Sequence, residues 1–254
     1  MAEMADILIY IILFIAGLIV GSFLNVVIYR IPRGLSIYKP TFSICPRCKA
    51  RIAFYDNIPL ISYLVLKGRC RSCGAKIPYI YPLVELATAL LFLLVFYFFG
   101  ITIQLLIGLI LVSALIAISV IDIQFRIIPN SITWPMTLVG IALNIIDRPS
   151  QWWMPLAFSV GAFVFMLIIH LIYPKGMGMG DVKLALMVGA FLVKSVIVAL
   201  FAGFLIGSIY GLVLIATRKK KFKQAIPFGP FISLGSIIAL FWGNIIINWY
   251  LGYF

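Results

Sequence analysis

Long stretches of apolar residues alternate with short polar segments along the chain. The first stretch, residues 7–29, carries no charge and has 23 residues, which is enough for a helix to cross a hydrocarbon core of about 30 Å. Further apolar segments follow at about 80–99, 101–121, 131–147, 154–173, 182–194, 195–217 and 230–252. This pattern predicts an all-α integral membrane protein with about eight transmembrane helices.

The first apolar segment does not have the pattern of a cleaved secretory signal. Two acids, Glu3 and Asp6, precede it where such a signal carries Lys or Arg, and it exceeds the usual ~7–15 apolar residues. We therefore expect three parts. Residues 1–29 form the first transmembrane helix, residues 30–78 a polar loop domain, and residues 79–254 a seven-helix membrane domain.

The composition excludes several classes of protein. Hydrophobic residues make up 64% of the 254 positions and charged residues only 11%, whereas soluble domains carry about 25% charged residues. His170 is the single histidine. A zinc site built on several histidines is therefore impossible, and a Ser-His or Cys-His protease would depend on His170 alone. Carboxylates or lysines are the expected acid–base groups.

The net charge of +13 is distributed unevenly. If the 30–78 loop is cytoplasmic, eight crossings place 122–130, 174–181 and 218–229 on the same side, and 18 of the 20 Lys and Arg residues lie there, counting Lys183. Such asymmetry orients membrane proteins. We therefore read the positive charge as an orientation signal and a contact with lipid rather than as a nucleic-acid site, and expect the Arg218–Lys223 run to be a lipid-facing anchor.

All four cysteines lie in the polar loop, in two C-x2-C pairs. They are Cys45 with Cys48 and Cys70 with Cys73. Four thiolates at this spacing complete a closed tetrahedral zinc shell, which predicts a structural zinc site that folds a loop too small for a core of its own. Two redox-active pairs are the alternative.

Among the seven acids, four lie on the expected cytoplasmic side: Asp56, Glu85, Asp122 and Asp181. Asp122 ends one apolar run, and Asp181 follows Gly176-Met177-Gly178-Met179-Gly180 and opens another, so both are expected at a similar membrane depth. Two facing carboxylates can share a proton and cleave an amide as aspartic proteases do. The alternative is that Asp181 caps a helix and Asp122 pairs with Arg126 or Lys183. The pattern alone does not choose.

Motifs along nearly the whole chain resemble one family, the bacterial type IV prepilin leader peptidases, which are aspartic membrane proteases of the GxGD class. The motifs, in chain order, are Gly21–Arg30, Cys45-Pro46-Arg47-Cys48, Asp56-Asn57-Ile58-Pro59, Ser62-Tyr63, the second cysteine pair, Tyr81-Pro82-Leu83-Val84-Glu85, Asp122 with Ile128-Pro129-Asn130, Gly178-Met179-Gly180-Asp181, and Pro227-Phe228-Gly229-Pro230.

The resemblance implies that Asp122 and Asp181 are the catalytic pair. It implies cleavage of the leader from type IV prepilins and type II secretion pseudopilins at the cytoplasmic face of the bacterial inner membrane. It also implies N-methylation of the new N-terminus with S-adenosylmethionine as donor, an activity associated with the zinc loop.

The implied substrates have a basic leader followed by an apolar helix. Asp56 and Glu85 are the acids available to receive the leader or to orient the amine for methylation, and for Glu85 a salt bridge with a nearby Lys or Arg is the alternative. Two other functions stay open from the residues alone. One is a transporter subunit whose intramembrane acids carry protons or cations, and the other is a membrane-anchored zinc module that only binds.

Overall fold

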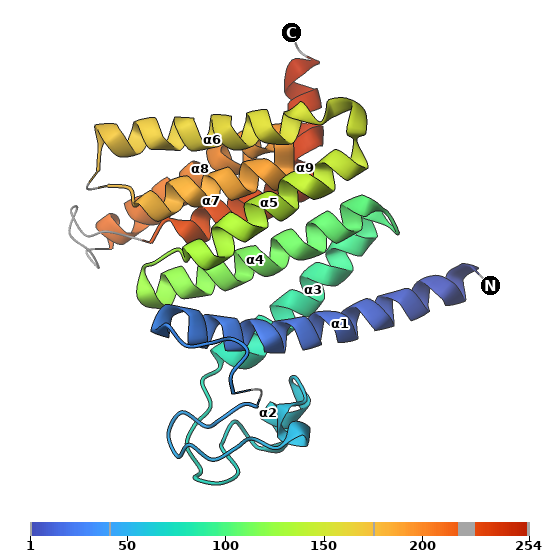
Figure 1. The fold of residues 1–254 in the computed structure, drawn as a ribbon, viewed down its shortest axis with the longest axis vertical. Coiled ribbons are helices and arrows are strands. Elements are labelled where there is room, and N and C mark those ends of the chain that lie inside the picture. Colours follow the sequence, from blue (N-terminus) through green and yellow to red (C-terminus); the bar gives the residue numbers. More distant parts are fainter. Residues whose placement is uncertain (1, 41, 175, 218–226, 253–254) are drawn as a thin grey trace. The chain divides into compact units, whose positions relative to one another are not determined.

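The structure is a computed structural model that describes residues 2–40, 42–174, 176–217 and 227–252 (Figure 1). The side chains of residues 2–5 are outside this description. The Arg218–Lys223 run, predicted to be a lipid anchor, also lies outside the described residues.

Within the described ranges the chain is helical and contains only isolated β-bridges. The long helices are α1 (Ala2–Arg30), α3 (Ile80–Phe99), α4 (Ile103–Phe125), α5 (Asn130–Asp147), α6 (Trp153–Ile172), α7 (Met179–Leu192), α8 (Val196–Ala216) and α9 (Gly229–Leu251), and the short helix α2 (Ile61–Val65) lies in the loop. One long helix occupies each predicted apolar segment. The predicted all-α fold class is confirmed.

Length and hydropathy support a slightly different number of membrane spans. Six stretches of the described chain are long and apolar enough to cross a membrane. One of them, Met179–Ala216, contains both α7 and α8, which are separated only by the short 3-10 turn η4 (Val193–Ser195). Helix α5, which contains Pro135, is not among the six. The chain is thus a multi-pass membrane protein whose helix number agrees roughly with the predicted eight.

The chain divides into two compact units, residues 1–101 and residues 102–254. The first unit contains α1, the loop and α3, and the second contains α4 to α9. Helix α3 thus groups with α1, whereas the sequence analysis placed it with the later helices. The predicted part boundaries after residues 29 and 78 stay predictions.

In the first unit α1 and α3 pack together at two glycines one turn apart. A Cβ atom on Gly17 would lie 2.5 Å from the Cα atom of Ala89, and one on Gly21 would lie 2.7 Å from the Cα atom of Glu85. No side chain fits at such distances, so small residues with this four-residue spacing let the two backbones meet, as in other membrane helix pairs.

The loop begins around a buried arginine at the end of α1. The guanidinium of Arg30 donates to the backbone carbonyls of Ser36, Ile37, Pro40 and Phe42, at 2.9–3.2 Å. One side chain thus gives hydrogen bonds to four carbonyls that would otherwise lack a partner within the loop. Arg30 therefore fixes the path of the chain as it leaves α1.

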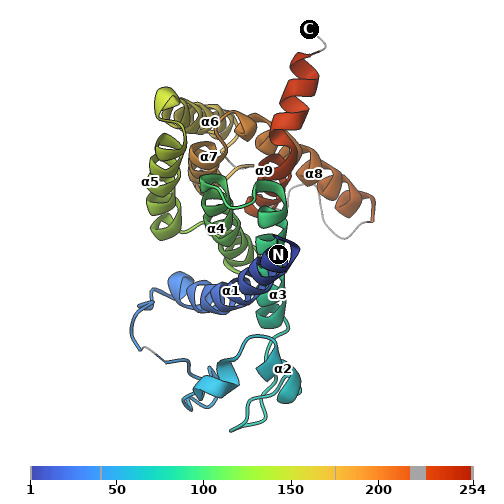
Figure 2. The same ribbon diagram turned by 90° about the vertical axis from the view of Figure 1, so that its right-hand side faces the viewer.

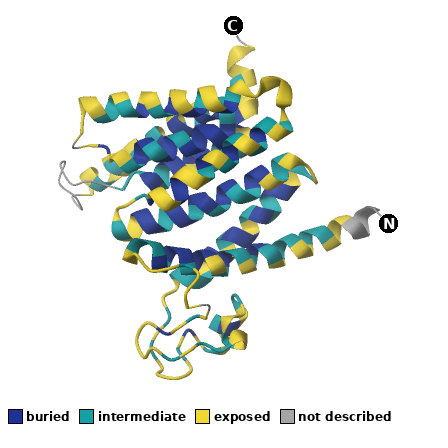
Figure 3. Ribbon diagram, viewed as in Figure 1, coloured by how far each residue is buried: buried dark blue, intermediate teal, exposed yellow. Residues whose placement is uncertain are grey.

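In the second unit the short helix α7 lies at the centre. Figures 2 and 3 show it among α4, α5, α6 and α9, with most of its residues buried. Polar side chains of its neighbours bind its backbone: the Ser159 hydroxyl donates to the Leu186 carbonyl, and the Asn144 amide donates to the carbonyls of Ala190 and Phe191. These contacts hold α7 in a fixed position, and with it Asp181 in its first turn.

Candidate active site and metal site

Asp122 lies in the last turn of α4 and is buried. Its Oδ2 atom accepts a hydrogen bond of 3.0 Å from the backbone N–H of Gly229, the first residue of α9. A Cβ atom on Gly229 would lie 2.7 Å from the same oxygen, so glycine is required for this close approach. The start of α9 therefore holds the Asp122 carboxylate.

Asp181 lies in the first turn of α7 and is also buried. Its Oδ2 atom accepts a hydrogen bond of 3.1 Å from the backbone N–H of Gly178, and its own N–H donates to the Gly178 carbonyl at 3.1 Å. One carboxylate oxygen thus caps the helix, which was one of the two alternatives from the sequence. Capping uses one oxygen and leaves the other available.

The structure brings these two carboxylates together. Asp122 and Asp181 lie close enough to interact electrostatically. The side chain of Ile128 connects their surroundings: a Cβ atom on Gly180 would meet it at 2.9 Å and one on Gly229 at 3.2 Å. The segment between α4 and α5 therefore packs between the two glycines that adjoin the carboxylates.

The ion pairs proposed as the alternative for Asp122 are not formed within the described residues. Lys183 donates instead to the side-chain oxygen of Asn130 at 3.0 Å. Among the described residues the Oδ1 atoms of Asp122 and Asp181 accept no hydrogen bond. Because neither oxygen is among the fully buried atoms that lack a partner, both keep some accessible surface and can bind a water molecule and exchange its proton.

His170, at the end of α6, contacts the segment before Asp181. Its Nδ1 atom lies 2.8 Å from the Met177 carbonyl, so this nitrogen carries the donated proton. From the sequence, His170 was considered only as the single histidine on which a Ser-His or Cys-His protease would depend. In the structure it anchors the backbone one residue before Gly178, and Gly178 is the donor to Asp181.

The four cysteines lie together in the loop. All four Sγ atoms are within 4.8 Å of one another, and those of Cys45 and Cys73 are 3.9 Å apart. A tetrahedral zinc ion with Zn–S bonds of about 2.3 Å requires sulfur separations of about 3.8 Å. The backbone N–H of Cys48 lowers the pKa of Cys45 to about 6, which favours a thiolate, whereas burial and the neighbouring sulfurs raise the pKa of Cys73 to about 11. The residues therefore fit a zinc ion.

The two cysteine pairs adopt the same local fold. The N–H of Cys45 donates to the Ala50 carbonyl, and the N–H of Cys70 donates to the Ala75 carbonyl. Lys49 and Gly74 have positive φ angles of 62° and 66° at equivalent places. Each pair is thus closed by a tight turn that aims both sulfurs to one side.

Asp56 lies in the loop and is paired. Arg71, between the second pair of cysteines, donates from Nε and Nη2 to its two carboxylate oxygens, at 2.8 and 2.6 Å. These hydrogen bonds hold the pKa of Asp56 below its usual value. The carboxylate joins two distant parts of the loop.

Glu85 lies in the second turn of α3 and is buried. Its Oε2 atom accepts a hydrogen bond of 2.9 Å from the backbone N–H of Leu60, and the side chains of Ser22 and Asn25 of α1 lie beside its carboxylate. The salt bridge considered for it is not formed within the described part of the chain. The amide of Asn25 also donates to the Tyr81 carbonyl and so joins α1 to α3.

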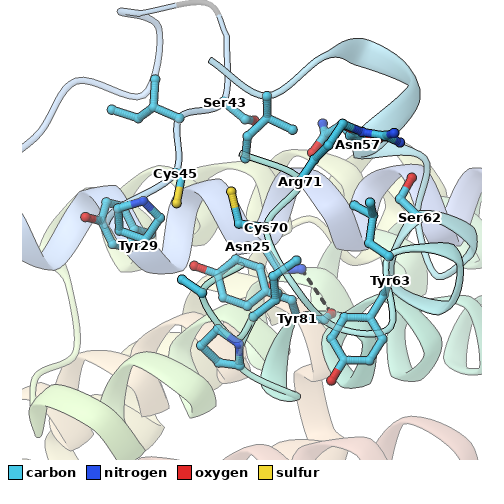
Figure 4. A pocket seen from close by; sticks show the side chains of 18 of the residues that line it. Asn25, Tyr29, Ser43, Cys45, Asn57, Ser62, Tyr63, Cys70, Arg71 and Tyr81 are labelled. Carbon is cyan, nitrogen blue, oxygen red and sulfur yellow. Dashed lines mark hydrogen bonds and ion pairs between the residues drawn. The ribbon is translucent and has the colours of Figure 1, made fainter. Parts of the chain in front are cut away.

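A large cavity of about 860 Å³ lies between the loop and the ends of α1 and α3. Figure 4 shows Asn25, Tyr29 and Tyr81 on one side of it and Cys45, Cys70 and Arg71 on the other. Glu85 also lines it. Ligand pockets in proteins have volumes of about 300–1,000 Å³, so a small organic molecule fits.

No role was predicted for Gly229, although it lies within the Pro227-Phe228-Gly229-Pro230 motif. The neighbouring Pro230 was the available signal. Proline is common in the first turn of a helix, and the N–H groups of that turn have no partner within the helix. A helix start at Gly229 therefore offers a donor, but only the fold shows that Asp122 receives it.

Comparison with known proteins gives matches over both units. Residues 15–99 match the model of the Bacterial Peptidase A24 N-terminal domain, and residues 109–212 match that of the Type IV leader peptidase family. No solved structure matches at a significant level.

Curated relatives match over nearly the full length and are named prepilin leader peptidase/N-methyltransferase. The protein from Bacillus subtilis is 39% identical, covering 94% of this chain and 97% of the relative. Those from Legionella pneumophila and Pseudomonas aeruginosa are 35% and 36% identical, covering 96% and 92% of this chain and 95% and 91% of the relatives. Since identity above 30% extends along almost the whole of both chains, this chain belongs to the type IV leader peptidase family.

Proposed function

We propose that the chain is a membrane aspartic endopeptidase that removes the leader from type IV prepilins and N-methylates the new N-terminus. Relatives named prepilin leader peptidase/N-methyltransferase support both activities. The observation that carries the cleavage reaction is the pair of buried carboxylates, Asp122 and Asp181, each held by one glycine N–H.

In the proposed cleavage the two carboxyl groups act as one unit. One takes a proton from a water molecule, which attacks the peptide carbonyl, and the other gives a proton to the leaving amine. Because the two groups interact, acid and base roles belong to the pair rather than to either residue. The hydrogen bonds from Gly178 and Gly229 fix one oxygen of each carboxylate, so that the other oxygens face the reacting atoms.

The proposed substrates are prepilins and type II secretion pseudopilins that carry a basic leader before an apolar helix. That helix would lie in the bilayer of the bacterial inner membrane, which places the scissile bond near the cytoplasmic face. The positions of the aspartates support this, since each lies within one turn of a helix end. The concentration of basic residues in the loops of one side supports the cytoplasmic orientation.

Methylation is proposed to use S-adenosylmethionine and to depend on the loop of residues 30–78. Cys45, Cys48, Cys70 and Cys73 would hold a structural zinc ion, as their sulfur separations support. With four protein ligands the ion has no open position, and its role would be to stabilise the loop.

The experiment that tests the cleavage site replaces each aspartate separately. Asp122→Asn and Asp181→Asn should each lower the rate of leader cleavage by at least about 100-fold, because general acid–base catalysis of this kind contributes 10²–10⁴. Cleavage of a purified prepilin is followed by mass spectrometry, which also reads the methyl group when S-adenosylmethionine is present. Full activity of either variant would exclude the pair.

Asp147→Asn is the matched control for these variants. Asp147 ends α5 in the same unit and pairs with Arg148 at 3.3 Å, away from the proposed catalytic machinery. Its replacement should leave cleavage within twofold of wild type. The transporter alternative receives no support from the comparisons, which match peptidases over both units.

A further inference from the structure

The cavity of the first unit contains a buried carboxylate that the cleavage reaction does not use. Glu85 is 8% exposed, lines the cavity and forms no ion pair within the described residues. A buried charge is costly unless it is paired. The hydrogen bond from the Leu60 N–H offsets part of this cost, and a cationic ligand would offset more.

The other acid of the cavity wall is already engaged. Asp56 binds the guanidinium of Arg71 through two hydrogen bonds. The Arg30 guanidinium is likewise occupied by four backbone carbonyls. Among the acids that line the cavity, Glu85 is therefore the one available to a positively charged group.

The walls of the cavity differ in character. Membrane helices contribute Ser22, Val26 and Glu85, whereas the loop contributes Arg47, Arg69 and Lys76. The cavity therefore combines a negative group at its membrane side with positive groups from a water-facing loop. Such a site suits two ligands that arrive from different surroundings: a cation from the bilayer side, and a soluble molecule with a carboxylate from the loop side.

A methyltransferase that acts on a pilin needs both a site for a cation at the membrane boundary and a site for a soluble methyl donor. After cleavage, the new N-terminal ammonium lies at the start of an apolar helix, at the membrane boundary. Glu85 lies five residues after the start of α3, or about 8 Å along the helix. The donor S-adenosylmethionine is soluble and carries a carboxylate.

We propose that this cavity is the methyl-transfer site and that Glu85 binds the N-terminal ammonium of the cleaved pilin. The inference rests on the proposed function and assigns a residue to its second reaction. The ammonium gives one proton to the Glu85 carboxylate, and the neutral amine forms a bond to the methyl carbon. The carbon–sulfur bond breaks with its electron pair left on sulfur, the product is a methylammonium, and the proton on Glu85 passes to water.

The test begins with Glu85→Gln, which keeps an oxygen to accept the Leu60 N–H but removes the charge. In the purified full chain, methylation should fall at least tenfold, while leader cleavage stays within twofold of wild type. The affinity for S-adenosylhomocysteine, measured by calorimetry, should also stay within twofold. Glu85→Asp, which keeps the charge, should retain more methylation than Glu85→Gln.

A second pair of variants tests the cavity itself. Val26→Trp places a large ring in the cavity, and Ile19→Trp places the same ring on the exposed face of the same helix. Val26→Trp should abolish binding of S-adenosylhomocysteine and methylation, whereas Ile19→Trp should leave both unchanged. This comparison remains decisive if Glu85→Gln does not fold.

The outcomes that overturn the inference are distinct from failure of the proposed function. Methylation of Glu85→Gln within twofold of wild type would remove Glu85 from the reaction. A tenfold loss of S-adenosylhomocysteine affinity in that variant would mean that the carboxylate serves the donor and not the amine. Normal methylation by Val26→Trp would exclude the cavity. A wild-type protein that neither cleaves nor methylates a prepilin would instead contradict the proposed function.

Discussion

Asp56 and Arg71 form the paired contact that ties the second cysteine turn to the preceding loop segment. Two parallel hydrogen bonds between a guanidinium and a carboxylate have a defined geometry, which a single lysine would not supply. The Arg71 side chain is 57% exposed, so water screens the pair and its contribution to stability is modest. The pair therefore fixes how the two loop segments align and adds little to the stability of the loop.

The stability of the loop should depend on pH through this pair. Because the folded pKa of Asp56 is lowered, the contribution is present at neutral pH and is lost as the pH falls below the ordinary range of an aspartate, about 4. The melting temperature of wild type should exceed that of Asp56→Asn by a constant amount above about pH 5. The difference should shrink below about pH 4 and disappear once the pH has fallen below the lowered pKa of Asp56, where both side chains are neutral. A difference that persists there would mean that packing, not charge, separates the two proteins.

At the scale of single residues, the sequence identified the acids but not their partners. Asp122 stands out because it ends an uncharged apolar run, and Asp181 stands out because it opens an apolar segment directly after a glycine-rich stretch. The donor to Asp122 is 107 positions away, and no local pattern connects the two. For Glu85 a salt bridge with a basic residue was one of two alternatives, but its hydrogen-bond donor is the backbone N–H of Leu60 and its other neighbours include neutral side chains.

At the scale of elements, the α1–α3 pair depends on close contact at Gly17 and Gly21. Gly21→Ala would place a methyl group 2.7 Å from the Glu85 Cα atom, and the helices would have to separate. We expect a loss of about 1–3 kcal/mol of stability, measured as a lower melting temperature in detergent. Methylation should fall as well, since Glu85 moves with α3.

Gly161→Ala is the matched control for this element. Gly161 lies inside α6, and a Cβ atom there would have no neighbour within 4 Å. Alanine favours a helix interior over glycine by roughly 0.5–1 kcal/mol, so the control should melt at the same temperature or higher. A Gly21→Ala protein as stable as this control would show that the helix pair adjusts without cost.

Helix positions were largely predictable, whereas helix ends were not. The predicted segment 80–99 coincides with α3, but 101–121 stops one turn before the end of α4 at Phe125, and 182–194 begins after the start of α7 at Met179. Hydropathy marks apolar residues, and the terminal turns here contain Asp122 and Asp181. The pattern therefore placed these acids beside the helices, although both lie within them.

The cysteine turns contain a repeat that the sequence also carries. Cys45-Pro46-Arg47-Cys48-Lys49-Ala50-Arg51-Ile52 and Cys70-Arg71-Ser72-Cys73-Gly74-Ala75-Lys76-Ile77 align without a gap, and their hydrogen bonds correspond. Lys49 replaces glycine at the position of positive φ. A search for glycines therefore finds only one of the two turns.

At the scale of the whole molecule, the two proposed reactions fall in different units. Asp122 and Asp181 belong to residues 102–254, and the cysteines and Glu85 to residues 1–101. Removal of zinc by a strong chelator should therefore abolish methylation and leave most leader cleavage intact. Cys70→Ser should likewise lose methylation and keep most leader cleavage. Adding zinc back should restore methylation in the chelator-treated wild type but not in Cys70→Ser.

The effect of zinc removal is tested by measuring leader cleavage and methylation together. Both are read from one prepilin by mass spectrometry, as the leader lost and the methyl group gained. Metal analysis of the same sample should give about one zinc per chain before chelation, as a four-thiolate site requires. If cleavage and methylation fall equally, the loop supports the entire fold and not one reaction.

The shortness of α7 has a consequence for the surrounding bilayer. With 14 residues it extends about 21 Å, less than the roughly 30 Å hydrophobic length that a free-standing span must match. A lipid-exposed helix of this size would cause mismatch and thin the membrane. Ten of its residues are buried against protein, so neighbouring helices and not acyl chains form its environment. Asp181, in the first turn of this short helix, can therefore lie deeper than the end of a full-length transmembrane helix without deforming the membrane.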